Sequence, residues 1–129
     1  MNKVNLVLLI EDSPVDLFIH KEVIIRSGLA TTIKSSTTAA DAINYLATLK
    51  EESIHPDIIF LDIRMPNMDG FEFLEAFEAL PEVAKKGIKI VMLSSSIDDR
   101  DLTRARLNPH VLAFIPKPLT AEKLQELWE

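Results

Sequence analysis

Short, nearly continuous apolar runs alternate along this chain with segments whose apolar residues recur at helical spacing. The clearest apolar runs occupy residues 7–10, 58–61, 90–93 and 112–115. Runs of this kind are typical of strands buried on both faces of a parallel sheet. Residues 31–35 form a shorter and more polar run. We therefore predict five strands, with residues 31–35 at an edge of the sheet.

Helical signals separate the predicted strands. Ser13 and Pro14 have the form of an N-cap followed by proline at the first helical position, and Gly28 supplies a stop signal. Further helices are predicted to begin near Thr38, at Asp69 with its capping partner Glu72, at Asp98 for a charged helix ending at residue 107, and near Thr120. Residues 50–56 and 81–87 are predicted to be loops.

The regular alternation of strand and helix predicts a three-layer α/β fold with right-handed crossovers. Five strands fit a doubly wound parallel sheet of order 2-1-3-4-5, with helices on both faces. In that order the first and third strands are neighbours at the switch point. We find no repeat, linker or low-complexity tract, so residues 1–129 are expected to form a single domain without an effector domain.

Composition narrows the function classes. The chain has 129 residues, no cysteine and a net charge of -6 at pH 7. Negative charge argues against a nucleic-acid surface, and no apolar stretch is long enough to span a membrane. The absence of cysteine excludes disulfides and thiolate metal sites and fits a cytoplasmic protein. A protein is therefore the expected partner.

Polar residues that handle phosphate and metal ions follow four of the predicted strands. Glu11 and Asp12 follow the first, Asp62 the third, Ser94 the fourth and Lys117 the fifth. Ligands of open α/β sheets bind at the carboxyl ends of the strands. We therefore expect these five side chains to converge on one small site.

Each of these residues also has an ordinary structural interpretation. Asp62 fits a loop cap, Glu11 and Asp12 fit first-turn acids at a helix dipole, Ser94 fits an N-cap, and Lys117 fits a solvated surface charge. Those interpretations give no reason to gather three carboxylates that repel each other. Oxygen ligands without His or Cys suit Mg²⁺, whose two charges, with that of Lys117, balance the three carboxylates.

Four segments together resemble the CheY-like receiver domains of two-component response regulators, which have the flavodoxin-like form of this fold. They are residues 9–13 (LIEDS), 60–70 (FLDIRMPNMDG), 91–95 (VMLSS) and 114–118 (FIPKP). The resemblance implies that Asp62 is the phosphoacceptor. It also implies that Mg²⁺ is held by Glu11, Asp12, Asp62 and the backbone carbonyl of Arg64.

The same resemblance assigns roles at the other strand ends. Ser94 and Lys117 are expected to bind phosphoryl oxygens, and the Lys117–Pro118 peptide is expected to be cis. Phe114 matches the aromatic residue that turns when a receiver is phosphorylated. The charged helix at residues 98–107, the fifth strand and the last helix are expected to form the face that binds a target protein.

The resemblance implies a signalling switch that takes a phosphoryl group from a sensor histidine kinase or a histidine phosphotransfer protein. A relay intermediate that passes the group to another histidine is an alternative. A hydrolase using Asp62 is a third possibility, although residues 62–64 lack the second acid of an Asp-x-Asp pair. His20, His55 and His110 are expected to lie outside the site, with structural or surface roles.

Overall fold

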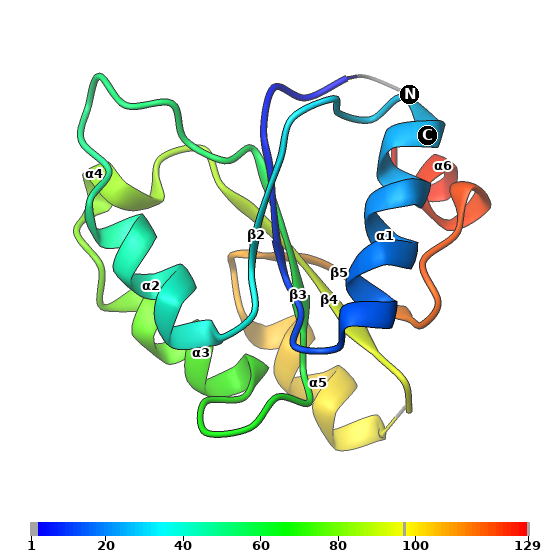
Figure 1. Cartoon of the computed structure of the whole chain (residues 1–129). Helices are drawn as coiled ribbons and strands as arrows, with labels where there is room; N and C mark the ends of the chain where they lie inside the picture. The colour runs from blue at the N-terminus through cyan, green and yellow to red at the C-terminus, as the bar shows by residue number, and fades with distance from the viewer. Residues whose placement is uncertain (1–2, 97, 129) are drawn as a thin grey trace.

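Five parallel strands form one sheet with the order β2-β1-β3-β4-β5. This computed structural model describes residues 3–96 and 98–128 (Figure 1). The strands are β1 Val7–Ile10, β2 Ile33–Ser36, β3 Ile58–Asp62, β4 Lys89–Ser94 and β5 Val111–Pro116. The helices are α1 Pro14–Ser27, α2 Ala39–Ala47, α3 Gly70–Glu78, α4 Glu82–Lys85, α5 Asp99–Leu107 and α6 Ala121–Trp128. The predicted fold class and strand order are confirmed.

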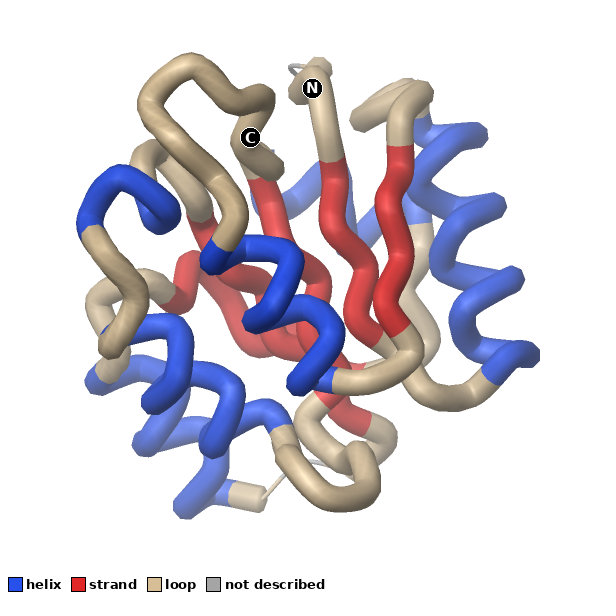
Figure 2. Tube along the Cα trace, turned by 60° about the vertical axis from the view of Figure 1, so that its left-hand side comes forward, coloured by secondary structure: helices blue, strands red, loops and turns tan. Residues whose placement is uncertain are grey.

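The helices cover the sheet on both faces (Figure 2). Alternate residues of each buried strand point to opposite faces, so β1 contributes Val7 to one core and Leu8 to the other. Ile24 of α1 and Leu124 of α6 belong to the Val7 core, whereas α2, α3 and α5 cover the opposite face. Every residue of β1 and β3 is buried, as their continuous apolar runs predict.

Local signals in the sequence explain the helix ends. The Ser13 side chain accepts the Asp16 N–H at the start of α1, and Gly28 ends the helix with a positive φ of 81°. A positive φ is costly for side chains with a Cβ, so glycine suits this end. Asp69 and Glu72 form the predicted capping box of α3.

Two boundaries differ from prediction. The predicted loop at residues 81–87 contains the single-turn helix α4, which has no side-chain cap and so carries no capping signal. Strand β2 begins at Ile33 rather than at residue 31, and it does lie at the edge of the sheet. Among the described residues, no helix has the length and apolar character needed to cross a membrane.

Candidate functional site

The carboxyl ends of β3, β4 and β5 are aligned by hydrogen bonds that continue past the strands. Ile63 N–H donates to the Leu93 carbonyl at 3.0 Å, and Lys117 N–H donates to the Ser94 carbonyl at 2.7 Å. These bonds bring the ends of β3, β4 and β5 to one edge of the sheet. The Lys117–Pro118 peptide is cis, as predicted.

Three carboxylates meet at this edge. Glu11, Asp12 and Asp62 each offer an oxygen, and these oxygens lie within 4.8 Å of one another. Glu11 is 1% and Asp62 is 3% exposed, and Glu11 Oε1 has no well-aligned hydrogen bond among the described residues. A cluster of hard oxygen donors, two of them from buried carboxylates, fits the ligand preference of Mg²⁺.

Lys117 stands at the centre of the acidic cluster. Its Nζ lies 2.9 Å from Glu11 Oε1, 3.0 Å from Asp16 Oδ2 and 3.2 Å from Asp62 Oδ1. Burial by itself lowers the pKa of the Lys117 ammonium, but its close contacts with the Glu11 and Asp16 carboxylates and the charge of Asp62 outweigh burial and hold that pKa above its usual value. The lysine therefore remains a cation at the phosphoacceptor candidate.

The protonation equilibrium of Glu11 is displaced toward the neutral acid. Burial raises the pKa of Glu11 to about 7, and the charge of Asp62 acts in the same direction while Lys117 opposes it. The other Glu11 oxygen, Oε2, accepts the Ser13 N–H at 3.2 Å. A divalent cation at the cluster would favour the ionised form of this carboxyl group.

Two residues at the site were not predicted from the sequence. Asp16 lies in the first turn of α1. Because this helix begins at the carboxyl edge, the position of Asp16 in the sequence could have indicated that it lies at the site. The prediction that His20 lies outside the site is wrong: it is 1% exposed, and its Nδ1 lies 3.8 Å from Glu11 Oε1. It is one helical turn beyond Asp16 and one turn before buried Ile24, so it faces the sheet.

The other two histidines have the structural roles that were predicted. The ring nitrogens of His55 lie 3.0 Å from the Ser53 carbonyl oxygen and 2.7 Å from the Val83 carbonyl oxygen, and His110 contacts Glu78. Neither residue contacts the acidic cluster.

Ser94 is buried at the edge with its hydroxyl engaged in its own loop. The hydroxyl donates to the Ser96 carbonyl and accepts the Ser96 N–H at 3.2 Å. Phe114 pairs in register with Met92 and is half-buried, lining one groove between β5 and α6 and another between α5 and β5. Ser94 and Phe114 therefore both lie on the β4–β5 side of the site.

The loop after β3 is closely packed. Gly70 N–H donates to the Ile63 carbonyl at 2.9 Å, and a Cβ on Gly70 would stand only 2.9 Å from Ile63 Cα. Arg64 N–H donates to Asp62 Oδ1 at 3.4 Å, while the Arg64 guanidinium extends to Asp101 on α5, with Nη2 2.7 Å from Oδ2. The metal role of the Arg64 carbonyl stays a prediction.

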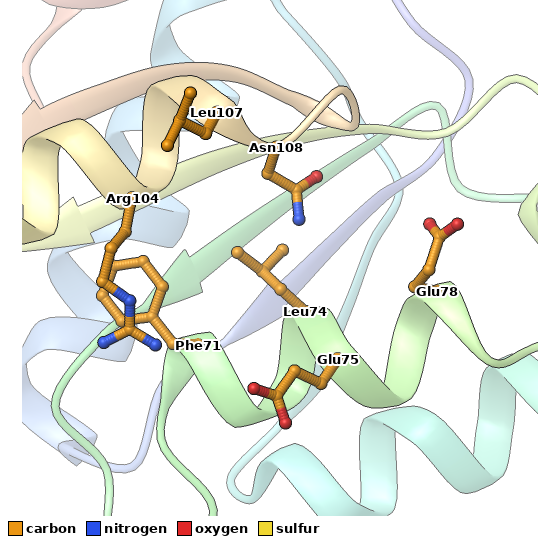
Figure 3. A pocket seen from close by; sticks show the side chains of 7 residues that line it. All are labelled: Phe71, Leu74, Glu75, Glu78, Arg104, Leu107 and Asn108. Carbon is orange, nitrogen blue, oxygen red and sulfur yellow. The ribbon is translucent and has the colours of Figure 1, made fainter.

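A groove of about 490 Å³ lies between α3 and α5 (Figure 3). Phe71 and Leu74 come from α3, and Arg104 and Leu107 come from α5. The guanidinium carbon of Arg104 stands 4.0 Å from the centroid of the Phe71 ring. None of the residues lining this groove belongs to the acidic cluster.

Residues 7–129 match the family model described as the response regulator receiver domain. The chain therefore belongs to this family, whose members are regulatory phosphoacceptor modules rather than enzymes, and the acidic triad is typical of the receiver Mg²⁺ site.

Solved structures agree with this assignment. A two-component response regulator from Cytophaga hutchinsonii is 34% identical with a TM-score of 0.89, over 98% of this chain and 96% of that one. A response regulator receiver protein from Dyadobacter fermentans DSM 18053 is 33% identical with a TM-score of 0.82, over 97% of this chain and 98% of that one.

Curated relatives extend further than this chain. The two-component response regulator ORR1 of Oryza sativa subsp. japonica is 33% identical in an alignment of 125 positions that covers 94% of this chain and 52% of the relative. The probable methanogenesis regulatory protein FilR2 of Methanothrix harundinacea (strain 6Ac) is 29% identical in an alignment of 131 positions that covers 95% of this chain and 83% of the relative. The chain thus spans about half the length of ORR1.

Proposed function

We propose that this protein is a signalling switch in which Asp62 is phosphorylated by a histidine kinase or a histidine phosphotransfer protein. The observation that carries the proposal is the Lys117 ammonium, which lies within 3.2 Å of carboxylate oxygens of Glu11, Asp16 and Asp62. The carboxylates at this site can hold a metal ion, and the ammonium can bind a phosphoryl oxygen.

The proposed reaction is a phosphoryl transfer between two protein side chains. An Asp62 carboxylate oxygen attacks the phosphorus of a phosphohistidine, the N–P bond breaks, and the imidazole leaves with the bonding electron pair. Mg²⁺, held by Glu11, Asp12, Asp62 and the Arg64 carbonyl, would supply positive charge to the phosphoryl oxygens. Lys117 would supply a second positive charge to these oxygens.

The phosphoryl group is proposed to change the positions of the Ser94 hydroxyl and the Phe114 ring. To donate to a phosphoryl oxygen, the Ser94 hydroxyl must leave the Ser96 carbonyl that it binds now. Its movement toward Asp62 would open space beside β5 into which the half-buried Phe114 ring turns.

The face built by α5, β5 and α6 is the proposed binding site for a target protein. Helix α5 buries only Asp101 and Ala105 against the rest of the molecule. Arg64 joins Asp101 to the loop that follows Asp62, so a phosphoryl group that attracts the Arg64 guanidinium would weaken the attachment of α5. The helix is thus the element most easily displaced.

Action as a final switch in the cytoplasm is part of the proposal. The fate of the phosphoryl group on the phosphoprotein distinguishes the relay alternative from the switch. A lifetime ended by hydrolysis supports the switch, and rapid return of the phosphoryl group to an added histidine phosphotransfer protein supports the relay.

The acceptor assignment is tested by intact mass after incubation with acetyl phosphate and Mg²⁺. The wild type should gain one phosphoryl group, and Asp62→Asn should gain none. Asp41→Asn, on α2, is the matched control and should be labelled like the wild type. Undiminished labelling of Asp62→Asn would exclude Asp62 as the acceptor.

A further inference from the structure

His20 and Glu11 place two polar atoms close together in the interior of the protein. Both side chains are 1% exposed, and His20 Nδ1 lies 3.8 Å from Glu11 Oε1. Neither atom has a well-aligned hydrogen bond among the described residues, although Lys117 is an ionic neighbour of Oε1. Buried polar atoms in native proteins are nearly always hydrogen-bonded, so this facing pair requires an explanation.

The two atoms are chemically complementary. An imidazole ring carries at least one N–H donor, whether it is neutral or protonated. A neutral imidazole has one N–H donor and one acceptor nitrogen, whereas an ionised carboxylate only accepts. An N–H on Nδ1 would therefore face an oxygen that still has room for a donor.

The Glu11 carboxylate is held unequally at its two oxygens. Oε2 accepts the Ser13 N–H at 3.2 Å, and that backbone donor is fixed at the start of α1. Oε1 relies on the Lys117 ammonium, which also serves Asp16 and Asp62. A phosphoryl group on Asp62 would offer Lys117 a more highly charged partner, so Oε1 would lose its contact with the Lys117 ammonium.

We propose that His20 is a positioning residue whose Nδ1–H binds Glu11 Oε1 once Lys117 has turned to the phosphoryl group on Asp62. This inference rests on the proposed phosphorylation of Asp62. With Ser13 N–H on one oxygen and His20 on the other, the carboxylate keeps its orientation toward the metal site. The glutamate side chain has one rotatable bond more than aspartate, so such a second support limits the conformations open to it.

A histidine that only fills space in the core would behave differently. In that case an apolar residue of similar size would replace His20 without any effect on the phosphorylated form. A residue that restores a donor at the δ position would then have no advantage over the apolar one.

The test compares His20→Leu, which removes the donor, with His20→Asn, whose side-chain amide places a donor near the position of Nδ1. The apparent affinity for beryllofluoride in the presence of Mg²⁺ is measured by ¹⁹F NMR, and the ¹⁵N signals of the His20 ring are recorded in the wild type. His55→Asn, a histidine variant remote from the acidic cluster, is the matched control. Thermal unfolding reports whether each variant is folded.

We expect His20→Leu to weaken beryllofluoride binding about tenfold or more, with His20→Asn within about threefold of the wild type and His55→Asn unchanged. In the wild type, beryllofluoride should give the ¹⁵N signature of an Nδ1–H in a hydrogen bond. Equal affinities of His20→Leu and the wild type, or equal losses in the Leu and Asn variants, would overturn the positioning role. An unchanged ring spectrum would also overturn it, even if the Leu variant does not fold.

The same titration separates the two hypotheses. If the wild type fails to bind beryllofluoride, the proposed phosphoacceptor function is wrong. If the wild type binds and the His20 variants do not differ from it, only the inference about His20 is wrong.

Discussion

The two sides of the carboxyl edge differ in how firmly they are held. On the β1–β3 side, both strands are completely buried, and Gly70 is pressed against the backbone that follows Asp62. On the β4–β5 side, the register of the strand pair shifts between Ile90 and Val91, and β5 is mostly half-buried or exposed. Helix α5 on that side buries only Asp101 and Ala105.

This difference suits two different tasks. Phosphoryl transfer requires reacting groups that are held in place, because a small misplacement of a reacting atom costs much of the rate. A signal requires an element with two arrangements of similar free energy. We therefore expect substitutions on the β1–β3 side to affect chemistry and metal binding, and substitutions on the β4–β5 side to affect how the signal spreads.

The largest effect is expected at the metal site. Asp12→Ala removes one of three carboxylates, and we expect Mg²⁺ affinity measured by calorimetry to fall about a hundredfold or more, because loss of groups that only support a metal ligand already costs about ten- to a hundredfold. Phosphorylation should fall with it. Asp16→Asn, which changes an acid bound to Lys117 but outside the triad, is the control and should lose far less affinity. Equal Mg²⁺ affinity in Asp12→Ala and the wild type would contradict the site.

The next effect concerns transmission. Ser94→Ala should still bind beryllofluoride but should lose the coupled change around Phe114, because a hydrogen bond to a charged group shifts a two-state equilibrium by about ten- to a hundredfold. Amide NMR spectra with and without beryllofluoride measure the change. Ser95→Ala, at the adjacent exposed position, is the control. Wild-type shifts across residues 98–128 in the Ser94 variant would show that the coupling does not run through this hydroxyl.

A smaller effect is expected in the pH dependence of stability. Because the pKa of Glu11 is raised from 4.5 to about 7, its protonated form stabilises the fold at low pH, and that stabilisation is lost as the pH rises toward 7. The free energy of unfolding of Glu11→Gln relative to the wild type should therefore increase from about pH 5 to about pH 8 without Mg²⁺, by on the order of 2 kcal/mol. Denaturant unfolding checks this, with Glu22→Gln on the exposed face of α1 as the control. A difference that does not vary with pH would contradict the burial of Glu11.

The smallest effect is expected at the Arg64–Asp101 ion pair. The Arg64 side chain is 55% exposed, so the pair is worth about 1 kcal/mol or less. Asp101→Asn should speed amide exchange in α5 by about two- to fivefold, whereas Asp99→Asn on the same helix should not. Unchanged exchange in the Asp101 variant would mean that other contacts hold α5.

Arg64→Asn should change the dephosphorylation rate severalfold without preventing phosphorylation, because Arg64 lies two residues past Asp62, where a long side chain can reach over a phosphoryl group. The decay of the phosphoprotein, followed by intact mass, measures this rate. A decay identical to that of the wild type would confine the role of Arg64 to its contact with α5.

The fold could be predicted because its signals are local. Continuous apolar runs at β1, β3 and β4 mark buried strands, and the Ser13 cap and Gly28 stop mark α1 without reference to any other part of the chain. The single turn of α4 lacks such signals, since its N-cap Pro81 makes no side-chain hydrogen bond. Elements are predictable from sequence when they carry their own caps and periodicity.

The site was predicted only in part, for a physical reason. Strand ends converge by topology alone, so Asp62, Glu11 and Lys117 were placed correctly. The contact of His20 with Glu11 depends on how α1 docks on the sheet, and the pair of Arg64 with Asp101 joins residues 37 positions apart. Spacing within a helix shows which side chains share a face. It does not show which residues of other elements that face contacts.

Hydrogen exchange of the wild-type protein with and without beryllofluoride and Mg²⁺ compares the two sides of the carboxyl edge in one measurement. We expect altered exchange in α5 and β5, with little change in β1 and β3 apart from the residues beside Asp62. Equal changes on both sides of the carboxyl edge, or no change in α5 while beryllofluoride is bound, would contradict the division between a fixed reaction site and a movable signalling face.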